Sequence, residues 1–401
     1  MLNTTSMARK MLLSKWDQAL KDTHLTIREG DQVHVVGCRD KDAAAQTLEM
    51  EVRQPRFYSR VLSFGSLGMG EAYMDEDFSV PVGEVYGLYT ALGRNRLHFK
   101  SRLDPLFALR YLYILAANKL TAHQSRIKTH YDLGVDLYKS FLDPYMFYTS
   151  GYPLHPDDDL DTMVTTMLDR VCRKLELKPD ETVVDLGCGF GSVLIYAAQH
   201  FGIRGVGVTI SPTHAETARE QVAKAGLSDR IEIRCGDYKT VPGQFDKVVS
   251  TGMIEHLYQS EYNEYFRTIV RYLKPGGLAY VNGICNSAVK NRHDPFIQKY
   301  IFPGTNQALL SELSRSCERA GLAILDVENT IRPYYYTAKR WCEKFEANRH
   351  TLDPQRYDGR FMRMWQIYWA WGLAAARYST GAHFELLLTN DTMRDHPLGR
   401  V

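Results

Sequence analysis

The sequence lacks the patterns that usually identify metal-binding, secreted and membrane-spanning proteins. Its seven cysteines include no C-x-x-C pair and no His/Cys cluster at the spacing of a zinc site. Because they are scattered and odd in number, a reducing compartment is expected, which favours the cytoplasm. The first residues have no continuous apolar core followed by a small-residue cleavage site, which argues against a signal peptide.

Long apolar runs and an excess of charge of one sign are also missing. The longest apolar stretches, 105–117 and 364–376, fall short of the roughly 18 residues that a membrane-spanning helix needs. With 49 basic and 47 acidic residues, the formal net charge is only +2 at pH 7. This excludes a globally basic nucleic-acid binder, so an anionic partner must meet a local patch. Apolar residues make up 44% of the 401 residues, enough for two or three folded domains.

One such patch lies in the N-terminal third. Between Gly93 and Lys128, eight basic residues stand against a single acid, Asp104, and aromatic side chains are interleaved with them. Phospholipid headgroups are the favoured partner, while a solvated helix face and nucleic acid stay open. Residues 7–20 have the spacing of a basic amphipathic helix, which more often docks on its own domain than lies on an anionic membrane.

The remaining N-terminal residues predict an α+β domain. Residues 24–36 and 46–52 alternate as strands do, with a turn at Glu29-Gly30-Asp31. The glycines of 64–80 indicate either loops or closely packed backbone. The first 129 residues therefore read as a separate folded region.

The most informative stretch runs from Glu181 to Tyr196. An apolar strand ending at Leu186 is followed by a glycine-dense turn and then by helical spacing. Glycines at alternate positions let backbone N–H groups approach a ligand, and a helix start favours a carboxylate or phosphate. The spacing is D-x-G-x-G-x-G from Asp185, not the dinucleotide pattern. It resembles the first motif of class I S-adenosylmethionine (SAM) methyltransferases.

Strands alternate with helices after this turn. The second strand, 205–211, ends without the carboxylate that a dinucleotide-binding fold places on the ribose, which disfavours NAD. The third ends at Asp237 and Tyr238, groups suited to an adenine edge and face. The fourth ends with Met253, Glu255 and His256 at the carboxyl edge of the sheet, where ligands bind. A turn at 274–277 opens the fifth, and the alternation predicts a doubly wound parallel sheet.

Several motifs, in order, resemble the cyclopropane fatty acid synthase family, which includes the mycolic acid methyltransferases. They are HYDLGVDLY, LDPYMFYTSGYP, DLGCGFGS, GVTIS, STGMIEHL, DPFIQKYIFPG and YYYTAKRW. The resemblance covers about 129 to the C-terminus and extends to FGSLGMGEAYMDEDFSV near the N-terminus. It implies methyl or methylene transfer from SAM to the double bond of an unsaturated acyl chain, esterified to membrane phospholipid in the full-length bacterial members. The product would be a cyclopropane or a methyl- or methylene-branched chain.

The resemblance also implies a SAM site. Tyr148 and Thr149 would lie along the cofactor, the glycines at its methionine end, and Asp237 with Tyr238 at its adenine. His214 stands where the family usually has Gln, so the ribose contact there differs. The residues assigned to SAM are Tyr148, Thr149, Asp185, Gly187, Gly189, Thr209, Ile210, His214, Asp237 and Tyr238.

The implied reaction needs alignment, exclusion of water and stabilisation of a developing cation, to which aromatic faces contribute about 0.5–2 kcal/mol each. A base must then remove the ring-closing proton, and in this family that base is thought to be a bound bicarbonate. Its ligands would map to Glu255, Tyr334, Ser150, Asn282 and, through its backbone, Ile284. Ser150 and Asn282 stand where the family typically has Cys and His. Both can hydrogen-bond an anion, but Asn cannot shuttle a proton.

We predict a lipid-docking domain at 1–129 and a SAM-dependent catalytic domain at 130–401, with a lid at about 328–380 formed by two aromatic-rich helical stretches. The expected location is the inner face of the cytoplasmic membrane, with phospholipid as partner and without metal or nucleic acid. A homodimer and a downstream reductase stay open as further partners. The alternatives are a SAM-dependent methyltransferase on a soluble or carrier-bound acceptor and a non-catalytic lipid-binding relative.

Overall fold

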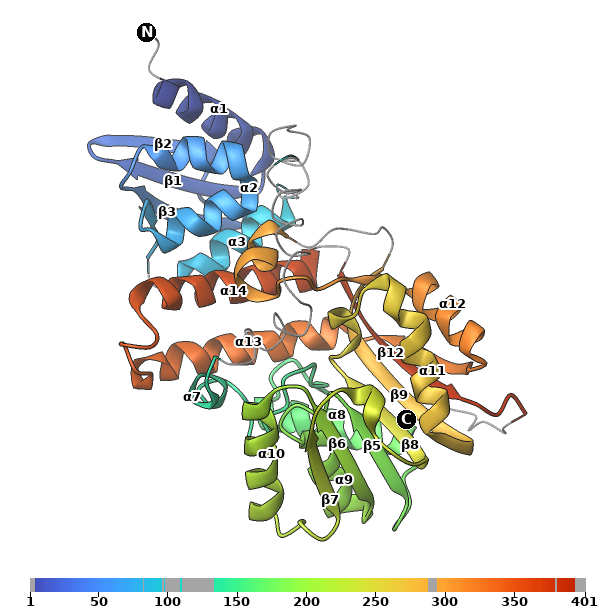
Figure 1. Ribbon diagram of the computed structural model, residues 1–401. Coiled ribbons are helices and arrows are strands. Elements are labelled where there is room, and N and C mark those ends of the chain that lie inside the picture. The colour runs from blue at the N-terminus through green and yellow to red at the C-terminus, as the bar shows by residue number, and fades with distance from the viewer. Residues whose placement is uncertain are drawn as a thin grey trace. The chain divides into compact units, whose positions relative to one another are not determined.

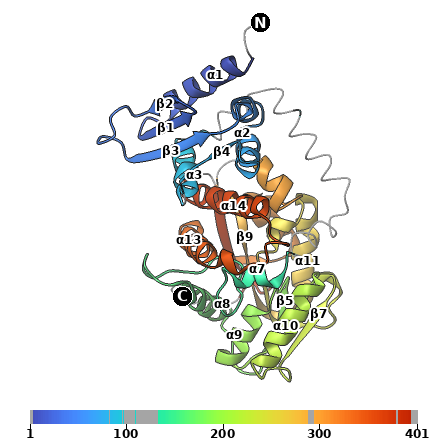
Figure 2. The same cartoon turned by 90° about the vertical axis from the view of Figure 1, so that its left-hand side faces the viewer.

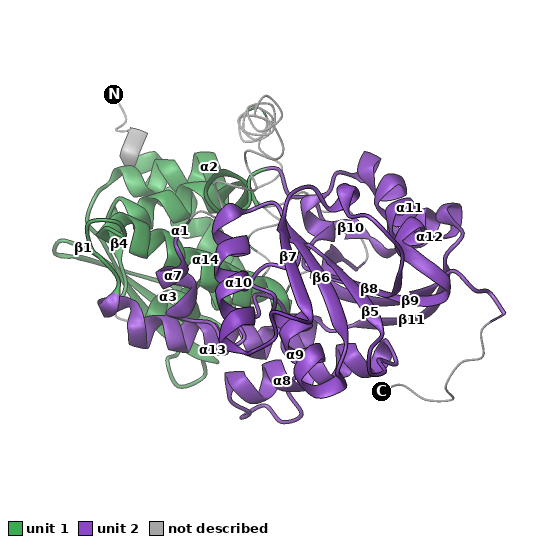
Figure 3. Cartoon of the chain, turned by 60° about the horizontal axis from the view of Figure 1, so that its bottom comes forward, with its two compact units in different colours: residues 1–121, 293–303, 352–379 green, residues 122–292, 304–351, 380–401 purple. Residues whose placement is uncertain are grey.

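The computed structural model (Figure 1) describes residues 4–81, 83–95, 97, 109, 133–287, 294–378 and 381–393. Its strands form two separate sheets, each accompanied by helices (Figure 2). The chain divides into two compact units, and each unit is assembled from several chain segments (Figure 3). Most of the basic, aromatic stretch predicted at 93–128 lies outside the described residues.

Unit 1 comprises 1–121, 293–303 and 352–379. Among its described residues, a four-stranded sheet has the order β2-β1-β3-β4, in which β1 and β2 form the predicted hairpin and β3 runs parallel to β1. The elements are α1 (Thr4–Ala19), β1 (Thr23–Glu29), β2 (Gln32–Gly37), β3 (Gln46–Val52), α2 (Arg56–Met74), β4 (Phe78–Ser79), α3 (Glu84–Arg94), the π-helical turn η5 (Ile297–Ile301) and α14 (Gly359–Tyr378).

Helix α1 docks on its own unit, as its amphipathic pattern favours. Leu12 and Trp16 are buried, and Arg9 forms an ion pair with Glu29 at the end of β1, at 3.0 Å. Met7, by contrast, is 62% exposed. The helix therefore packs through one face and leaves apolar side chains on another.

The glycine-rich residues at 64–80 are largely helical and closely packed, so the loop reading was wrong for most of this stretch. Helix α2 continues through them with a kink at Gly65, where φ is 55°. A Cβ at Gly68 would clash with the Arg60 carbonyl oxygen, and one at Gly70 would clash with the Phe296 ring. Glycine is tolerated within this helix because neighbouring atoms come too close for any side chain.

Helix α14 packs on α2 and α3 within unit 1. Trp365 and Trp369 are buried, and the Tyr73 hydroxyl donates to Gln366 Oε1 at 3.1 Å. These contacts explain why 352–379, predicted as part of a lid over the catalytic domain, groups with the N-terminal residues. The boundary at residue 129 and the lid itself stay predictions.

Unit 2 comprises 122–292, 304–351 and 380–401. Its described residues form an eight-stranded sheet with the order β11-β12-β9-β8-β5-β6-β7, and β10 pairs with β9. The elements are α7 (Val135–Lys139), α8 (Leu160–Lys174), β5 (Thr182–Leu186), α9 (Ser192–Phe201), β6 (Arg204–Thr209), α10 (Pro212–Lys224), β7 (Ile231–Cys235), η2 (Tyr238–Thr240), β8 (Phe245–Thr251), η3 (Ile254–His256), η4 (Gln259–Glu261), α11 (Tyr262–Tyr272), β9 (Leu273–Asn286), β10 (Ala308–Leu309), α12 (Leu310–Ala320), β11 (Ala323–Asn329), α13 (Ile331–Asn348), η6 (Arg349–Thr351) and β12 (Gly381–Thr389).

The five strands from β5 to β9 are parallel, as the alternation of strands and helices predicts. From β5 the chain continues outward through β6 and β7, then crosses to β8 on the other side, so the strand order reverses between β5 and β8. Strand β12, antiparallel to β9, carries the last predicted strand. In the part of the chain that the structure describes, no helix combines the length and apolar character needed to cross a membrane.

Candidate active site

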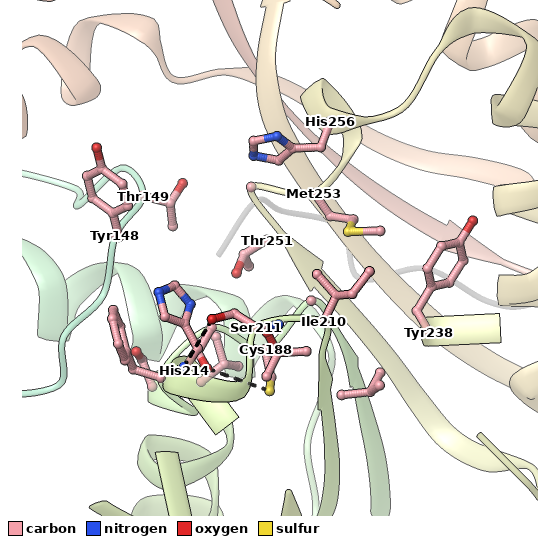
Figure 4. A pocket seen from close by; sticks show the side chains of 18 of the residues that line it. Tyr148, Thr149, Cys188, Ile210, Ser211, His214, Tyr238, Thr251, Met253 and His256 are labelled. Carbon is pink, nitrogen blue, oxygen red and sulfur yellow. Dashed lines mark hydrogen bonds between the residues drawn. The ribbon is translucent and has the colours of Figure 1, made fainter. Parts of the chain in front are cut away.

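A pocket of about 350 Å³ lies at the carboxyl ends of β5, β6, β7 and β8, next to the reversal of strand order. Ligands of open α/β sheets bind at this place. Nine of the ten residues that the resemblance assigns to SAM line the pocket, and Asp185 is the exception. Figure 4 shows side chains converging on it from the segment at Tyr148 and from the loops that follow these strands.

The glycine turn after β5 brings bare backbone to the pocket. Gly187 and Gly189 have φ values of 84° and 53°, which L side chains rarely adopt. No atom lies within 4 Å of a Cβ built at Gly189, so the main chain borders open space there. Helix α9 begins at Ser192, and its free N–H groups follow directly. This arrangement suits a ligand with a carboxylate.

Asp185 lies beside the pocket lining, in the core. It is 1% exposed, and neither carboxyl oxygen has a hydrogen-bond partner within the described residues. Burial raises the pKa of this carboxyl to about 8. An orphaned buried carboxyl is costly unless a donor completes it. The predicted contact with the amino-acid end of SAM would supply such a donor, and it stays a prediction.

The opposite end of the pocket combines a carboxylate and a ring. Asp237 Oδ1 accepts the Lys239 N–H at 3.0 Å, which fixes the turn after β7. The Tyr238 ring lies edge-on to Tyr265 at 5.9 Å between centroids. The structure therefore presents the two group types predicted for an adenine edge and face.

His214 lines the pocket from the first turn of α10, although a lone histidine opening a helix reads as a surface residue. Ser211 caps the helix by accepting the His214 N–H at 3.2 Å. The imidazole lies 4.2 Å from the Phe190 ring. Burial lowers its pKa to about 4, so it is neutral at pH 7. It forms part of an aromatic wall.

Sequence reasoning missed more than half of the pocket lining. Phe190 and Ser192 lie inside the glycine motif, and a closer reading of the motif could have included them. Thr251 and Gly252 gave no signal beyond ending a strand. Met253 and His256 were expected at the ligand-binding edge of the sheet, and both line the pocket. The lining residues that were missed are Met146, Phe147, Cys188, Phe190, Ser192, Val193, Val208, Ser211, Gly236, Lys239, Thr251, Gly252, Leu257 and Glu261.

Glu255 and Ile284 meet where β9 passes the end of β8. The Ile284 N–H donates to the Glu255 carboxylate, which packs so closely on Gly283 that no Cβ would fit. Glu255 Oε2 is buried and has no hydrogen-bond partner among the residues described. Burial raises the pKa of Glu255 to about 7. A carboxyl that titrates near neutral pH suits proton transfer.

Ser150 and Asn282, the two residues that depart from the family pattern, already form hydrogen bonds within the protein. Ser150 is fully buried and donates to the Gly151 carbonyl oxygen at 2.8 Å. Asn282 Oδ1 accepts the Gly252 N–H at 3.0 Å, and its Nδ2 donates to the Tyr280 hydroxyl at 3.2 Å. One N–H and one lone pair of the Asn282 amide remain. A bound anion would therefore find few free donors here.

Tyr334 lies on α13 beside a histidine that sequence reasoning did not single out. The Tyr334 and His383 rings are 5.2 Å apart. His383 is fully buried and pairs in register with Ile284 across β9 and β12. Burial lowers the pKa of His383 to about 3, so its imidazole is neutral. One histidine in an apolar strand carries no sequence signal for this neighbourhood.

Known proteins resemble the chain over most of its length. Residues 118–381 match the family model described as mycolic acid cyclopropane synthetase. The chain is 35% identical to the cyclopropane-fatty-acyl-phospholipid synthase of Escherichia coli (strain K12), covering 80% of this chain and 82% of that protein. It is 29% identical to the tuberculostearic acid methyltransferase UfaA1 of Mycobacterium tuberculosis, covering 88% and 86%. The structure of mycolic acid cyclopropane synthase CmaA1 complexed with SAH and CTAB has a TM-score of 0.60 at 22% identity, covering 67% and 99%.

Proposed function

Since the chain belongs to the mycolic acid cyclopropane synthetase family, we propose that it transfers a methyl or methylene group to the double bond of unsaturated acyl chains in membrane phospholipids. It is a SAM-dependent methyltransferase that modifies unsaturated lipid acyl chains. Among the geometric observations, the convergence of nine assigned residues on one pocket at the reversal of strand order carries the proposal. The product is a cyclopropane or a methyl- or methylene-branched chain.

The pocket fits SAM, which when bound supplies an electrophilic methyl group on its sulfonium. The bare backbone at Gly189 and the N-terminus of α9 suit the carboxylate of its amino-acid end. The orphaned carboxyl of Asp185 suits the ammonium, and Asp237 with Tyr238 suits the adenine. In this proposal the chain's own residues hold the cofactor and keep water from the reacting carbon atoms.

Glu255 is our proposed proton-handling residue. One of its oxygens is held by the Ile284 N–H, while Oε2 is left for a reacting group. The residues around it fit a bound bicarbonate only in part, because Ser150 uses its only donor and Asn282 uses one of its two inside the protein. Bicarbonate binding therefore stays a prediction, tested by turnover in bicarbonate-depleted buffer.

We also propose peripheral association with the inner face of the membrane. The basic, aromatic composition of 93–128 supports headgroup binding. Exposed Met7 and Met11 on α1 add an apolar contact. A homodimer and a downstream reductase are further proposals, which rest on the resemblance alone.

The decisive experiment is expression in a bacterium rich in monounsaturated phospholipid, fed methyl-deuterated methionine. Mass spectrometry should find acyl chains heavier by one labelled one-carbon unit. A product that has lost one deuterium and resists hydrogenation is a cyclopropane, whereas a reducible product is methylene-branched. Unlabelled phospholipid together with a labelled soluble acceptor would overturn the lipid assignment in favour of the alternative acceptor. Cells expressing Glu255→Gln provide the matched control.

A further inference from the structure

The turn that carries the Tyr238 ring is held by hydrogen bonds from helix α11. Residues 238–241 follow β7 and contain η2, and Tyr238 and Lys239 from this turn line the pocket. Figure 4 shows the Tyr238 ring on the opposite side of the pocket from Tyr148. The buried Tyr265 ring of α11 lies edge-on to it. The side chains of α11 therefore reach the part of the pocket predicted to hold adenine.

Tyr272, the last residue of α11, is bonded to both ends of the turn. Its hydroxyl donates to the Tyr238 carbonyl oxygen at 2.8 Å and accepts the Val241 N–H at 3.1 Å. A phenol has one proton to donate and lone pairs that accept, so one oxygen can serve both backbone groups. Tyr272 is only 1% exposed, which leaves little access for water to replace its hydroxyl.

Arg271, the residue before it, supports the middle of the turn. Its Nη2 donates to the Lys239 carbonyl oxygen at 2.8 Å and to the Tyr272 hydroxyl at 3.4 Å. Unlike Tyr272, Arg271 is exposed. Two adjacent residues of one helix therefore bond three backbone positions of the turn.

These hydrogen bonds act on the main chain, and the main chain carries the ring. The Tyr238 carbonyl belongs to the same residue as the ring, so a shift of the turn moves the ring with it. An aromatic contact depends on the distance and tilt of the two rings. A group that is already ordered before the ligand arrives also binds more tightly, because no ordering cost is added on binding.

We propose that Tyr272 is a positioning residue for the adenine end of the SAM pocket. It lies outside the pocket lining and acts through the backbone of the turn, with Arg271 as a second support. The inference rests on the proposed function, because the adenine of SAM is the group predicted to contact Tyr238. A tyrosine that only stabilised the fold would leave SAM affinity unchanged when its hydroxyl was removed.

The main test is Tyr272→Phe, which keeps the buried ring and removes both hydrogen bonds to the turn. Calorimetry should find SAM bound about fivefold more weakly, equal to about 1 kcal/mol. The KM for SAM should rise by about the same factor. Because the residue acts on cofactor binding, kcat at saturating SAM should keep the parent's value.

The matched control is Tyr262→Phe, at the first residue of the same helix. Tyr262 is equally buried, but its hydroxyl accepts from Asn306 Nδ2 at 2.7 Å and not from the turn. This variant should lose similar stability and keep the parent's SAM affinity.

Arg271→Met tests the second support at an exposed position, where a substitution costs little stability. It should weaken SAM binding about twofold, because the Lys239 carbonyl oxygen loses its donor. Arg267→Met is its control, one helical turn earlier and also exposed. The Arg267 guanidinium donates to the Asn263 carbonyl oxygen within α11 at 3.0 Å, so its loss should leave SAM affinity unchanged.

The outcomes separate the inference from the proposed function. A lower melting temperature of Tyr272→Phe with unchanged SAM affinity overturns the inference and leaves the proposed function standing. Equal SAM losses in Tyr262→Phe also overturn it, because they show a general effect of stability. If Tyr272→Phe fails to fold, the two arginine variants decide, and equal SAM affinities in them overturn the inference. A parent protein that does not bind SAM overturns the proposed function itself.

Discussion

The candidate active site has two halves that are built in different ways. The cofactor half is made mainly of backbone, from positive-φ glycines, strand ends and the start of α9. The base half, around Glu255, is made of side chains whose partners come from η3, β9, β12 and α13. A backbone site tolerates exchanges of side chain but not an added Cβ. A side-chain site should fail when a single atom is changed.

The largest effect is expected in the base half, from Glu255→Gln. The amide oxygen can still accept the Ile284 N–H, but the group no longer titrates near pH 7. Turnover should fall about a hundredfold to ten-thousandfold, the range of general acid–base catalysis. Label incorporation into phospholipid measures this loss, and calorimetry should find SAM affinity unchanged. Turnover within threefold of the parent would remove Glu255 from the mechanism.

The next effect falls on the cofactor half, from Gly187→Ala. The added Cβ would need a φ of 84° and would lie 3.1 Å from Met253 Sδ. We expect about tenfold weaker SAM binding, measured by calorimetry, because the strain of about 1–2 kcal/mol disturbs the glycine loop. Gly226→Ala is the control, since it has a φ of 70° but open space around it. Equal SAM losses in both variants would show a general effect of strain.

A third prediction concerns the pH dependence of stability without SAM. The pKa of Asp185 is raised from 3.8 to about 8, so the folded state holds this proton more tightly than the unfolded chain does. That stabilisation is complete below pH 3.8 and is lost as the pH rises toward 8. Asp185→Asn should therefore lose less stability than the parent between pH 5 and pH 8. Melting temperatures at the two pH values measure the difference, and parallel losses would contradict it.

The smallest effect is expected from His214→Gln, which restores the residue usual in the family. The imidazole is neutral, and its ring centroid lies 4.2 Å from that of Phe190. It therefore gives the pocket a packing surface and not a charge. SAM affinity should change by less than about threefold. A tenfold loss of SAM affinity, measured by calorimetry, would contradict the view that the cofactor half is made mainly of backbone, because one side chain would then dominate its binding.

The sequence predicts these halves unequally. The glycine spacing and the alternation of strands and helices were enough to predict the parallel sheet and a ligand site at its carboxyl edge, where the structure has a pocket lined by Gly187 and Asp237. The partners of Asn282 could not be predicted, since they depend on which strands become neighbours. Lys174 and Glu385 form a 2.8 Å hydrogen bond across 211 residues of chain. No periodicity or spacing links residues so far apart.

The glycine-rich residues of 64–80 show a different limit. Composition alone left loops and close packing open, because glycine serves both. The structure has a kinked helix there, stabilised by contacts such as that between Gly70 and Phe296. The Gly70–Phe296 contact joins residues more than two hundred positions apart, and helix propensity, which depends only on neighbouring residues, could not predict it.

The segmented make-up of unit 1 has a consequence for how the protein is made. Its N-terminal sheet leaves the ribosome early, but α14, which packs on α2 and α3, is synthesised more than two hundred residues later. At typical rates of translation the delay is on the order of tens of seconds. Throughout that time the nascent chain exposes the apolar surface that Trp365 and its neighbours later cover. The N-terminal part is thus completed only when α14 has been made, and a chain cut short before α14 would be a substrate for chaperones and proteases.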